Sequence, residues 1–486
     1  PGPTILVSQN TTIKVTFNNK LTRQSEAKFS SESGRKNDIS DPDTGNLHFH
    51  GGHVTSVLPG DDTTLVVGPG ESYDYIIPVL EEHAPGLHWI HPHHHGSTSL
   101  HVGGGAASAF IVRDPPGFLP PQLEDAAEKV MVFQDIDMFK LQQQALRAND
   151  ERFRRSMLGV IDSKVPGHSD LKNRFVTING VYQPTLTMTS GKWQRWRMLF
   201  AGWRTSHLAF RTLDNGADCE FQLLAKDGVY LSDFPRPVGE LLIPTGGRAD
   251  VMVRCNSVGS TTYSAIDREV MRVVVEELEG SSMKDNDLIP WAPEVLPKYL
   301  QDLTTSKVSP GCSCDTKFSG EGDHSYVNGR SYLSGNHYLH SSYLGAVVER
   351  HLSFEKEHSY HQHVYPFQLV SDNFSSNYFQ MGDWHDSYMD GDRSAAIRYR
   401  PTVLSGKIMI HCHNNIHSDR GMLAKEYVLN ITNGQCQCDI FGSISGSGIV
   451  DDVGPILQPI SAPNSGASRS MMTILALTGS AFAAVI

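Results

Sequence analysis

The sequence predicts an all-β protein of three domains, and three observations support this prediction. The chain has 486 residues, which corresponds to three domains at the usual size of about 150 residues each. Its 43 glycines and 26 prolines are typical of a chain with many turns. Between the turns lie short apolar or alternating runs, which indicate strands rather than helices. Each predicted domain is long enough to bury a hydrophobic core of its own.

The first predicted domain comprises residues 1–116 and contains two His-x-His pairs. The chain opens inside the pattern of a strand, so we expect the natural N-terminus to lie upstream. Because alternate side chains of a strand point to the same face, each pair presents two imidazoles to one side. The pairs are His48 with His50 and His91 with His93.

The next two segments carry no comparable cluster, and a third domain follows them. Residues 128–276 are rich in strand patterns but contain no His-x-His pair, so we interpret them as a spacer domain that shapes the molecule. Residues 277–322 are rich in serine, proline and aspartate and are predicted to be a linker. The third domain, residues 323–440, contains a cluster of three histidines: His358, His361 and His363.

The most informative stretch of the third domain is its last histidine motif. An apolar run leads into His411, Cys412 and His413, which indicates a buried strand with both imidazoles on one face and the thiol on the other. His417 and Met422 follow in the next loop. With one more histidine, these groups would complete the two-His, one-Cys site with a weak axial Met that is typical of an electron-transfer copper. The flanking histidines would then carry electrons to a second metal centre one residue away.

The His-x-His pattern occurs four times, and its eight imidazoles could hold three metal ions between the first and third domains. A ligand set rich in imidazole and poor in carboxylate suits copper better than magnesium or calcium. Zinc is disfavoured because its structural sites draw four closed ligands from short sequence spacings. We therefore expect a copper protein.

The seven cysteines indicate an oxidising compartment. Apart from Cys412, six remain, and we predict three disulfides. Cys219 with Cys255 would close a loop inside the second domain. The other four would tie the start of the third domain to its end, and the sequence leaves their pairing open: Cys312, Cys314, Cys436 and Cys438.

Charge and tail composition bear on partners and location. The formal charge of −12 and the lack of any Lys/Arg block argue against a nucleic-acid partner. Residues 441–486 are rich in Gly, Ser and Pro and end in an apolar run shorter than the ~20 residues of a membrane-spanning helix. Small residues ahead of this run resemble a lipid-anchor attachment signal, and an ordinary terminal segment is the alternative. Three Asn-x-Ser/Thr triplets agree with a secreted or surface-held glycoprotein: Asn10, Asn373 and Asn430.

These motifs resemble those of the three-domain multicopper oxidases, a family that includes laccases, ferroxidases and bilirubin oxidases. The resemblance covers nearly the whole chain and rests on four motifs: His-x-His-Gly at 48–51, His-Pro-His-x-His-Gly-Ser at 91–97, His-x-x-His-x-His at 358–363, and His-Cys-His-x-x-x-His-x-x-x-Gly-Met at 411–422. It implies three cupredoxin-like Greek-key β-sandwiches, four copper ions, and two partners, dioxygen and a small reducing substrate. We expect a monomer.

The resemblance assigns each ligand to one of three kinds of copper. The type 1 copper would be held by His358, Cys412, His417 and axial Met422. The type 2 copper would be held by His48 and His361. The two type 3 coppers would each be held by three histidines: His50, His91 and His413 for one, and His93, His363 and His411 for the other. Four single electrons would pass from the type 1 copper through the cysteine to the other three, where dioxygen is reduced to water.

Dioxygen reduction consumes protons, so an acid near the trinuclear cluster is expected. In similar enzymes a carboxylate a few residues beyond the first His-x-His motif has this role, and Asp61 and Asp62 lie at the matching place. Such enzymes often carry a glutamate just after the His-Cys-His motif, whereas this chain has Asn415 and Ser418 there. Asp419 is adjacent and is the candidate for a second proton donor.

The resemblance leaves the reducing substrate open. A phenol or aromatic amine would make the protein laccase-like, which is the favoured prediction. The alternative is a ferroxidase or other metal-ion oxidase, which would need carboxylates beside the type 1 histidines: Asp383, Asp386 and Asp419. A copper-binding storage protein is the non-enzymatic alternative. Further histidines near the motifs are interpreted as packing groups or hydrogen-bond partners of the ligands: His53, His88, His94, His95 and His101.

Overall fold

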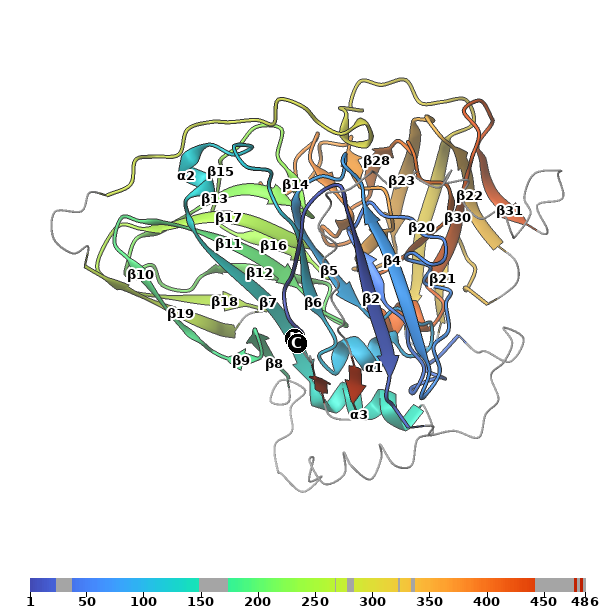
Figure 1. The fold of residues 1–486 in the computed structure, drawn as a ribbon, viewed down its shortest axis with the longest axis horizontal. Helices are drawn as coiled ribbons and strands as arrows, with labels where there is room; N and C mark the ends of the chain where they lie inside the picture. Colours follow the sequence, from blue (N-terminus) through green and yellow to red (C-terminus); the bar gives the residue numbers. More distant parts are fainter. Residues whose placement is uncertain are drawn as a thin grey trace, which may run out of the picture.

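A computed structural model describes most of the chain (Figure 1). The described residues are 1–22, 37–147, 174–266, 268–277, 284–321, 324–333, 337–441, 476–478 and 481–483. Within them strands in several sheets dominate and helices are few and short, which confirms the all-β prediction. No helix in these ranges is long and apolar enough to cross a membrane. The small residues of the predicted anchor signal lie outside the described residues.

The first domain packs two sheets over an apolar core. Its strands are β1 (Ile5–Val7), β2 (Thr11–Asn19), β3 (His48–His50), β4 (Ser72–Val79), β5 (Gly86–His91) and β6 (Ser108–Val112), joined by β32 (Ala476–Thr478) and β33 (Ala481–Ala483). One sheet has the order β1-β6-β5-β3 and the other β33-β32-β2-β4. β2 alternates because its apolar side chains Ile13, Val15 and Phe17 are buried in the core between the sheets. β3 and β5, which carry histidines, are buried on both faces.

The second domain contains the largest sheet of the molecule. Its strands are β7 (Ala127–Asp137), β8 (Arg174–Ile178), β9 (Val181–Tyr182), β10 (Thr185–Thr189), β11 (Trp193–Phe200), β12 (His207–Thr212), β13 (Cys219–Lys226), β14 (Val229–Tyr230), β15 (Arg236–Val238), β16 (Leu241–Pro244), β17 (Arg248–Cys255), β18 (Gly259–Ala265) and β19 (Arg268–Glu276). One sheet has the order β14-β13-β17-β11-β7-β8-β9 with β15 beside β13, and the other has β10-β19-β18-β12-β16. The turn between β16 and β17 brings Gly246 close to the rings of His50 and His413.

The third domain is formed by two six-stranded sheets. Its strands are β20 (Ser313–Glu321), β21 (His324–Val327), β22 (His337–Tyr343), β23 (Val348–Phe354), β24 (Tyr360–Gln362), β25 (Phe367–Leu369), β26 (Trp384–His385), β27 (Ser387–Tyr388), β28 (Ala395–Tyr399), β29 (Gly406–Cys412), β30 (Leu423–Leu429) and β31 (Gln437–Phe441). The orders are β21-β20-β23-β28-β25-β26 and β27-β24-β29-β30-β22-β31. β20 lies inside the predicted linker, residues 277–322, yet it pairs in parallel with β23, so this sheet begins earlier than the sequence indicates. The sequence did not predict this strand because β20 is mostly polar and contains a cysteine.

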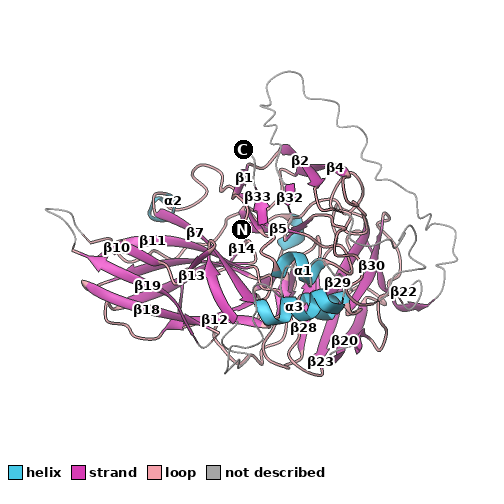
Figure 2. Cartoon of the chain, turned by 90° about the horizontal axis from the view of Figure 1, so that it is seen from below, coloured by secondary structure: helices cyan, strands magenta, loops and turns pink. Residues whose placement is uncertain are grey.

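Helices gather where the three domains meet. α1 (Thr98–Gly103), α3 (Met138–Arg147) and α5 (Asn415–Asp419) belong to the first, second and third domains, whereas α2 (Pro121–Glu124) and a 3₁₀ turn (Lys298–Leu300) lie in connecting segments. α1 and α3 lie side by side (Figure 2). Val102, Leu141, Trp203 and Ile416 form one buried apolar cluster between these elements. This contact fixes α5, and therefore the loop after the His-Cys-His motif, against the other two domains.

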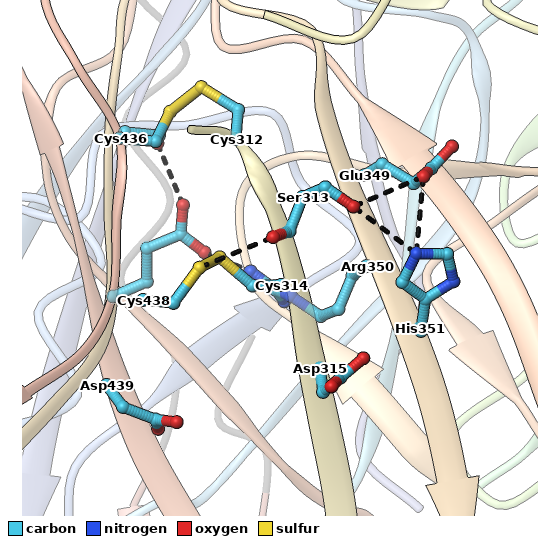
Figure 3. The surroundings of a disulfide bond; sticks show 12 residues. Cys312, Ser313, Cys314, Asp315, Glu349, Arg350, His351, Cys436, Cys438 and Asp439 are labelled. Carbon is cyan, nitrogen blue, oxygen red and sulfur yellow. Dashed lines mark hydrogen bonds and ion pairs between the residues drawn. A yellow bond between two sulfur atoms is a disulfide. The ribbon is translucent and has the colours of Figure 1, made fainter. Parts of the chain in front are cut away.

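Three disulfides form as predicted, and the structure settles the pairing that the sequence left open. One bond joins Cys219 to Cys255 across β13 and β17. The other two lie side by side near the surface of the third domain (Figure 3): Cys312 with Cys436 and Cys314 with Cys438. They tie β20 to β31, so the first and last strands of this domain are linked twice. Cys412 is free and buried, as its predicted role requires.

Candidate metal centre

The Cys412 site is assembled within the third domain. Cys412 is the last residue of β29 and lies opposite Tyr360 of β24, close to His358. Its Sγ atom is 3.6 Å from Nδ1 of His358 and 3.8 Å from Nδ1 of His417. These atoms lie together as the ligands of one metal ion would, so the structure brings the predicted type 1 residues together.

The surroundings of this site suit a metal-bound thiolate. Met422 is buried, and its carbonyl oxygen accepts a hydrogen bond of 3.1 Å from the backbone N–H of Cys412, so the two residues are neighbours. Burial raises the pKa of the Cys412 thiol to about 12, so a thiolate at neutral pH requires a bound cation. His358 is buried but His417 is half-buried, so the site meets the surface at His417.

Eight imidazoles converge between the first and third domains. Four lie on or directly after β3 and β5, and four lie on or directly after β24 and β29. The register places His48 opposite His91 and His361 opposite His411. Rings from the two domains interleave: His48 stacks on His363 with 3.8 Å between the ring centroids. The cluster is therefore an interface between domains, formed only when they dock.

In several cluster histidines the outward ring nitrogen is hydrogen-bonded, which leaves the lone pair of the inward nitrogen free for a metal ion. Three histidines bond from Nδ1 to a backbone carbonyl oxygen at 2.8 to 3.0 Å: His91, His361 and His411. The buried Nε2 atoms of His48, His91 and His361 have no hydrogen-bond partner among the described residues. A buried ring nitrogen with a lone pair and no donor fits a metal ligand.

The inward nitrogens fall into the predicted groups. In each of three sets, one ring nitrogen from every histidine lies within 4.8 Å of those of the other two: His48, His50 and His361; His50, His91 and His413; and His93, His363 and His411. The second and third sets match the two predicted type 3 sites, and the first contains the predicted type 2 pair. Burial, reinforced by the neighbouring rings, lowers the pKa of the imidazoles, so they are neutral at pH 7 as metal ligands must be. A set made of imidazole alone fits copper.

The structure separates the two aspartates proposed as proton donors. Asp61 is buried, and its Oδ2 lies 2.8 Å from Nδ1 of His48, while its Oδ1 accepts from the backbone N–H of Phe49 at 3.2 Å. Asp62 instead accepts hydrogen bonds from the N–H and hydroxyl of Thr64. Asp61 is therefore the carboxyl group that contacts a cluster histidine.

Asp419 is buried, and its hydrogen bonds are to backbone N–H groups rather than to an imidazole. Its two carboxyl oxygens accept from the N–H groups of Gly96 and Ser99, each at 2.8 Å. Asn415 is also buried and donates to the carbonyl oxygen of His413 at 3.3 Å. Asp419 thus fixes the segment after His93, and a proton-donor role for it stays a prediction.

The three aspartates considered as ligands for ferrous ion are all buried, and the ferroxidase alternative stays a prediction. Asp383 is buried against Lys226 and Arg236 at 2.5 and 2.8 Å. Asp386 is buried at the histidine cluster, where its Oδ1 lies 3.1 Å from Nε2 of His50. The two aspartates flank β26, which contacts β14 of the second domain, and β27 after it pairs with β24. Asp419 is buried as described above.

A carboxylate that sequence reasoning missed is adjacent in the chain to a type 1 ligand. Glu357 is exposed, precedes His358, and accepts a hydrogen bond of 2.9 Å from the hydroxyl of Ser206 in the second domain. Its position directly before a predicted ligand was the one signal in the sequence.

The second domain reaches the cluster, which corrects its interpretation as a spacer. The turn between β16 and β17 passes against the rings of the first and third domains. A Cβ atom built on Gly246 would lie 2.7 Å from Cε1 of His50 and 2.8 Å from ring atoms of His413. No metal-ligating residue marks this turn, so only its pair of glycines hinted at a close approach.

The remaining histidines near the motifs lie outside the three ligand groups, as predicted. His53 bonds through Nδ1 to the carbonyl oxygen of Val364 at 3.1 Å. His94 lies 3.3 Å from Asp41, and His101 bonds to the carbonyl oxygen of Pro42 at 2.9 Å. Such contacts fix the loops that carry the ligands rather than bind metal themselves.

Comparison with known proteins agrees with this geometry. A family model described as multicopper oxidase matches residues 300–430, the part that contains the Cys412 site and half of the cluster. This part of the chain is therefore similar to the multicopper oxidase family. The chain is 25% identical over 369 residues to Laccase-1 of Thanatephorus cucumeris, an alignment that covers 72% of this chain and 55% of that protein. The chain therefore spans about half the length of this curated relative.

Solved structures extend the similarity of fold to all three domains. A laccase from Pediococcus acidilactici superposes with a TM-score of 0.65 and 19% identity, covering 88% of this chain and 83% of that one. A multicopper oxidase from Campylobacter jejuni, described as a metallo-oxidase, superposes with a TM-score of 0.63 and 18% identity over 88% and 85% of the two chains. At this identity the superpositions establish the fold, three cupredoxin-like domains.

Proposed function

We propose that this protein is a laccase-like copper oxidase that takes single electrons from a small organic reductant and uses them to reduce dioxygen to water. One observation carries the proposal. Cys412 places its sulfur in one site while the residues on either side, His411 and His413, place their imidazoles in the other. Copper bound at these ligands would supply the one-electron chemistry and the reduction of dioxygen. A storage protein has no need for this covalent link between two kinds of site.

The residues of this chain would hold the copper ions, orient the ligand rings and shield the cluster from water. The cluster imidazoles are buried, so bulk water is excluded from the space between them. Asp61 accepts from Nδ1–H of His48 and so keeps Nε2 of that ring available as a ligand atom. Asp61 is also the carboxyl closest to the cluster on the first-domain side, and we propose that it passes protons toward the site through its carboxyl oxygens.

The surface at His417 suits an organic reductant better than ferrous ion, because the carboxylates first considered for ferrous ion are not exposed there. Asp383, Asp386 and Asp419 are all buried, whereas Glu357, directly before His358 in the chain, is exposed. A phenol or aromatic amine needs only contact with the half-buried imidazole of His417 to transfer an electron. Ferrous ion remains the second candidate because Glu357 offers it one anionic ligand.

We also propose that the protein works outside the cytoplasm. Three disulfides are present, and a protein so cross-linked is typical of oxidising compartments. The three Asn-x-Ser/Thr asparagines are exposed and accessible to glycosylation: Asn10, Asn373 and Asn430.

Dioxygen uptake by copper-loaded protein tests the proposed function. A diphenol, an aromatic diamine and ferrous ion are compared in parallel, with copper-free protein as the control. We expect copper-dependent uptake that is faster with the organic reductants. Faster uptake with ferrous ion would replace the laccase-like assignment by a ferroxidase. Stoichiometric copper binding without uptake from any reductant would contradict the oxidase and favour storage.

A further inference from the structure

We propose that Arg248 of the second domain and Asp386 of the third domain form a positioning pair that sets the ring orientation and proton position of His50. The pair would thereby control copper occupancy of the trinuclear cluster. This inference rests on the proposed copper chemistry, but it concerns residues that coordinate no metal. It gives the second domain, which carries no ligand, a role in building the site.

His50 is oriented differently from its neighbours in the cluster. His48, His91, His361 and His411 are hydrogen-bonded outward through Nδ1. In His50 the Nδ1 atom points inward, 3.2 Å from Nε2 of His413, and Nε2 points outward. A neutral imidazole carries a single N–H, so His50 can offer a lone pair at Nδ1 only if its proton is on Nε2. An acceptor facing Nε2 is therefore needed to fix the correct tautomer.

Asp386 is that acceptor, and it contacts two cluster histidines. Its carboxyl Oδ1 lies 3.1 Å from Nε2 of His50, and its backbone carbonyl oxygen lies 2.8 Å from Nδ1 of His361. Ser387 donates from its hydroxyl to the same Oδ1 at 2.9 Å. One residue thus orients a ligand from the first domain and a ligand from the third.

Arg248 holds the Asp386 carboxylate with a two-pronged contact. Nη1 donates to Oδ1 at 2.8 Å and Nη2 to Oδ2 at 2.6 Å, the bidentate arrangement that fixes both distance and plane. The guanidinium is fully buried and is itself held by carbonyl oxygens of both the first and second domains, Leu87 at 3.1 Å and Asp227 at 2.9 Å. Because its position is fixed from two sides, Arg248 leaves the carboxylate little freedom to turn.

The backbone around the pair is shaped to admit it. Gly51, directly after His50, has no side chain, and a Cβ atom there would lie 2.1 Å from Nη2 of Arg248 and 2.8 Å from Oδ2 of Asp386. The Asp227 carboxylate accepts from the N–H of Arg248 at 2.8 Å and from the N–H of Asp386 at 3.1 Å. The second domain therefore grips both members of the pair, and all three domains meet behind His50.

The experiment compares Asp386→Leu with Asp386→Asn and with a matched control. Leucine branches at the same carbon as aspartate but has no acceptor, whereas asparagine keeps a carbonyl oxygen for His50 but loses the charge that pairs with Arg248. The control is Asp250→Leu, which breaks another buried aspartate–arginine pair of the second domain, with Arg195 at 2.9 and 2.5 Å. That pair contacts no cluster histidine among the described residues. Copper affinity of the cluster, copper per chain and the blue absorption of the Cys412 site are measured, with thermal unfolding as the check on folding.

We expect Asp386→Leu to weaken copper binding at the cluster about 10- to 100-fold while the Cys412 site keeps its copper. Asp386→Asn should lie between this variant and the unaltered protein, and Asp250→Leu should lower only the unfolding temperature. Unchanged cluster copper in a folded Asp386→Leu protein would overturn the inference. If that variant does not fold, unchanged cluster affinity in Asp386→Asn would overturn it instead. Unaltered protein that holds full copper but consumes no dioxygen would contradict the proposed function alone.

Discussion

The two copper-binding regions differ in how they are built. The Cys412 site draws its ligands from one domain, and His417 and Met422 follow the cysteine within a single turn of chain. The histidine cluster draws half its ligands from the first domain and half from the third, and the second domain closes it. The first site depends on local folding, whereas the second depends on three domains docking in register. Substitutions at the contacts between domains should therefore disturb the histidine cluster more than the Cys412 site.

The strongest test of the link between the two regions is Cys412→Ser. Loss of the sulfur removes both a type 1 ligand and the covalent path to His411 and His413, but leaves every cluster histidine in place. We expect the blue absorption to vanish and dioxygen uptake to fall to that of copper-free protein, while cluster copper is retained. Copper analysis and oxygen-electrode measurements check this. Substantial uptake by the variant would show that electrons reach the cluster by another route.

Gly246→Ala should produce the opposite pattern. The added Cβ would lie 2.7 Å from His50 and 2.8 Å from His413, and alanine is strained at the φ of +84° that this residue adopts. We expect cluster copper to fall and uptake to drop about 100-fold, the scale of a misplaced reacting geometry, with the blue site intact.

Gly70→Ala is the matched control for this substitution. Gly70 has a similar φ of +80°, but a Cβ there would meet nothing within 4 Å. Any loss of activity in the Gly70→Ala variant therefore measures the effect of backbone strain alone. Equal losses of activity in both variants would contradict the view that the second domain forms a wall of the cluster.

The same contrast explains what the sequence could and could not predict. The proposed ligands lie in local sequence motifs. A His-x-His pair places two rings on one face of a strand, and Cys412 lies on the opposite face from His411 and His413. All twelve proposed ligands could therefore be named from the sequence. Contacts between domains left no such pattern. Gly246 approaches His50 across an interface, and Asp386, which the sequence offered only as a possible ligand for ferrous ion, lies between β26 and β27 and contacts His50. The cysteines behaved likewise: their number predicted three bonds, but the partners of Cys312 and Cys314 required the fold.

The paired disulfides of the third domain should support the local site more than the cluster interface. Each closes a loop with a sequence separation of 124 residues, and a loop of this length stabilises by about 4–5 kcal/mol in the chain-entropy model. Because both bonds close nearly the same loop, replacing Cys312 and Cys436 by serine should cost much less than this. Replacing all four cysteines should cost the full amount and lower the unfolding temperature of the domain that holds Cys412. Calorimetry of the two variants distinguishes redundant from additive bonds, and equal steps would contradict redundancy.

Acid should weaken a contact between the second and third domains. Burial acts to raise the pKa of Asp383, but the charges of Lys226 and Arg236, both in the second domain, outweigh it and hold the pKa well below its ordinary value of 3.8. A carboxyl with a depressed pKa contributes stability that is complete above its unfolded pKa and is lost as the pH falls through the folded one. The unaltered protein should therefore be more stable than Asp383→Asn at pH 7, and the difference should shrink below about pH 4. Chemical denaturation at several pH values measures it. A difference that stays constant down to pH 2 would show that this buried carboxylate does not hold the second and third domains together through its charge.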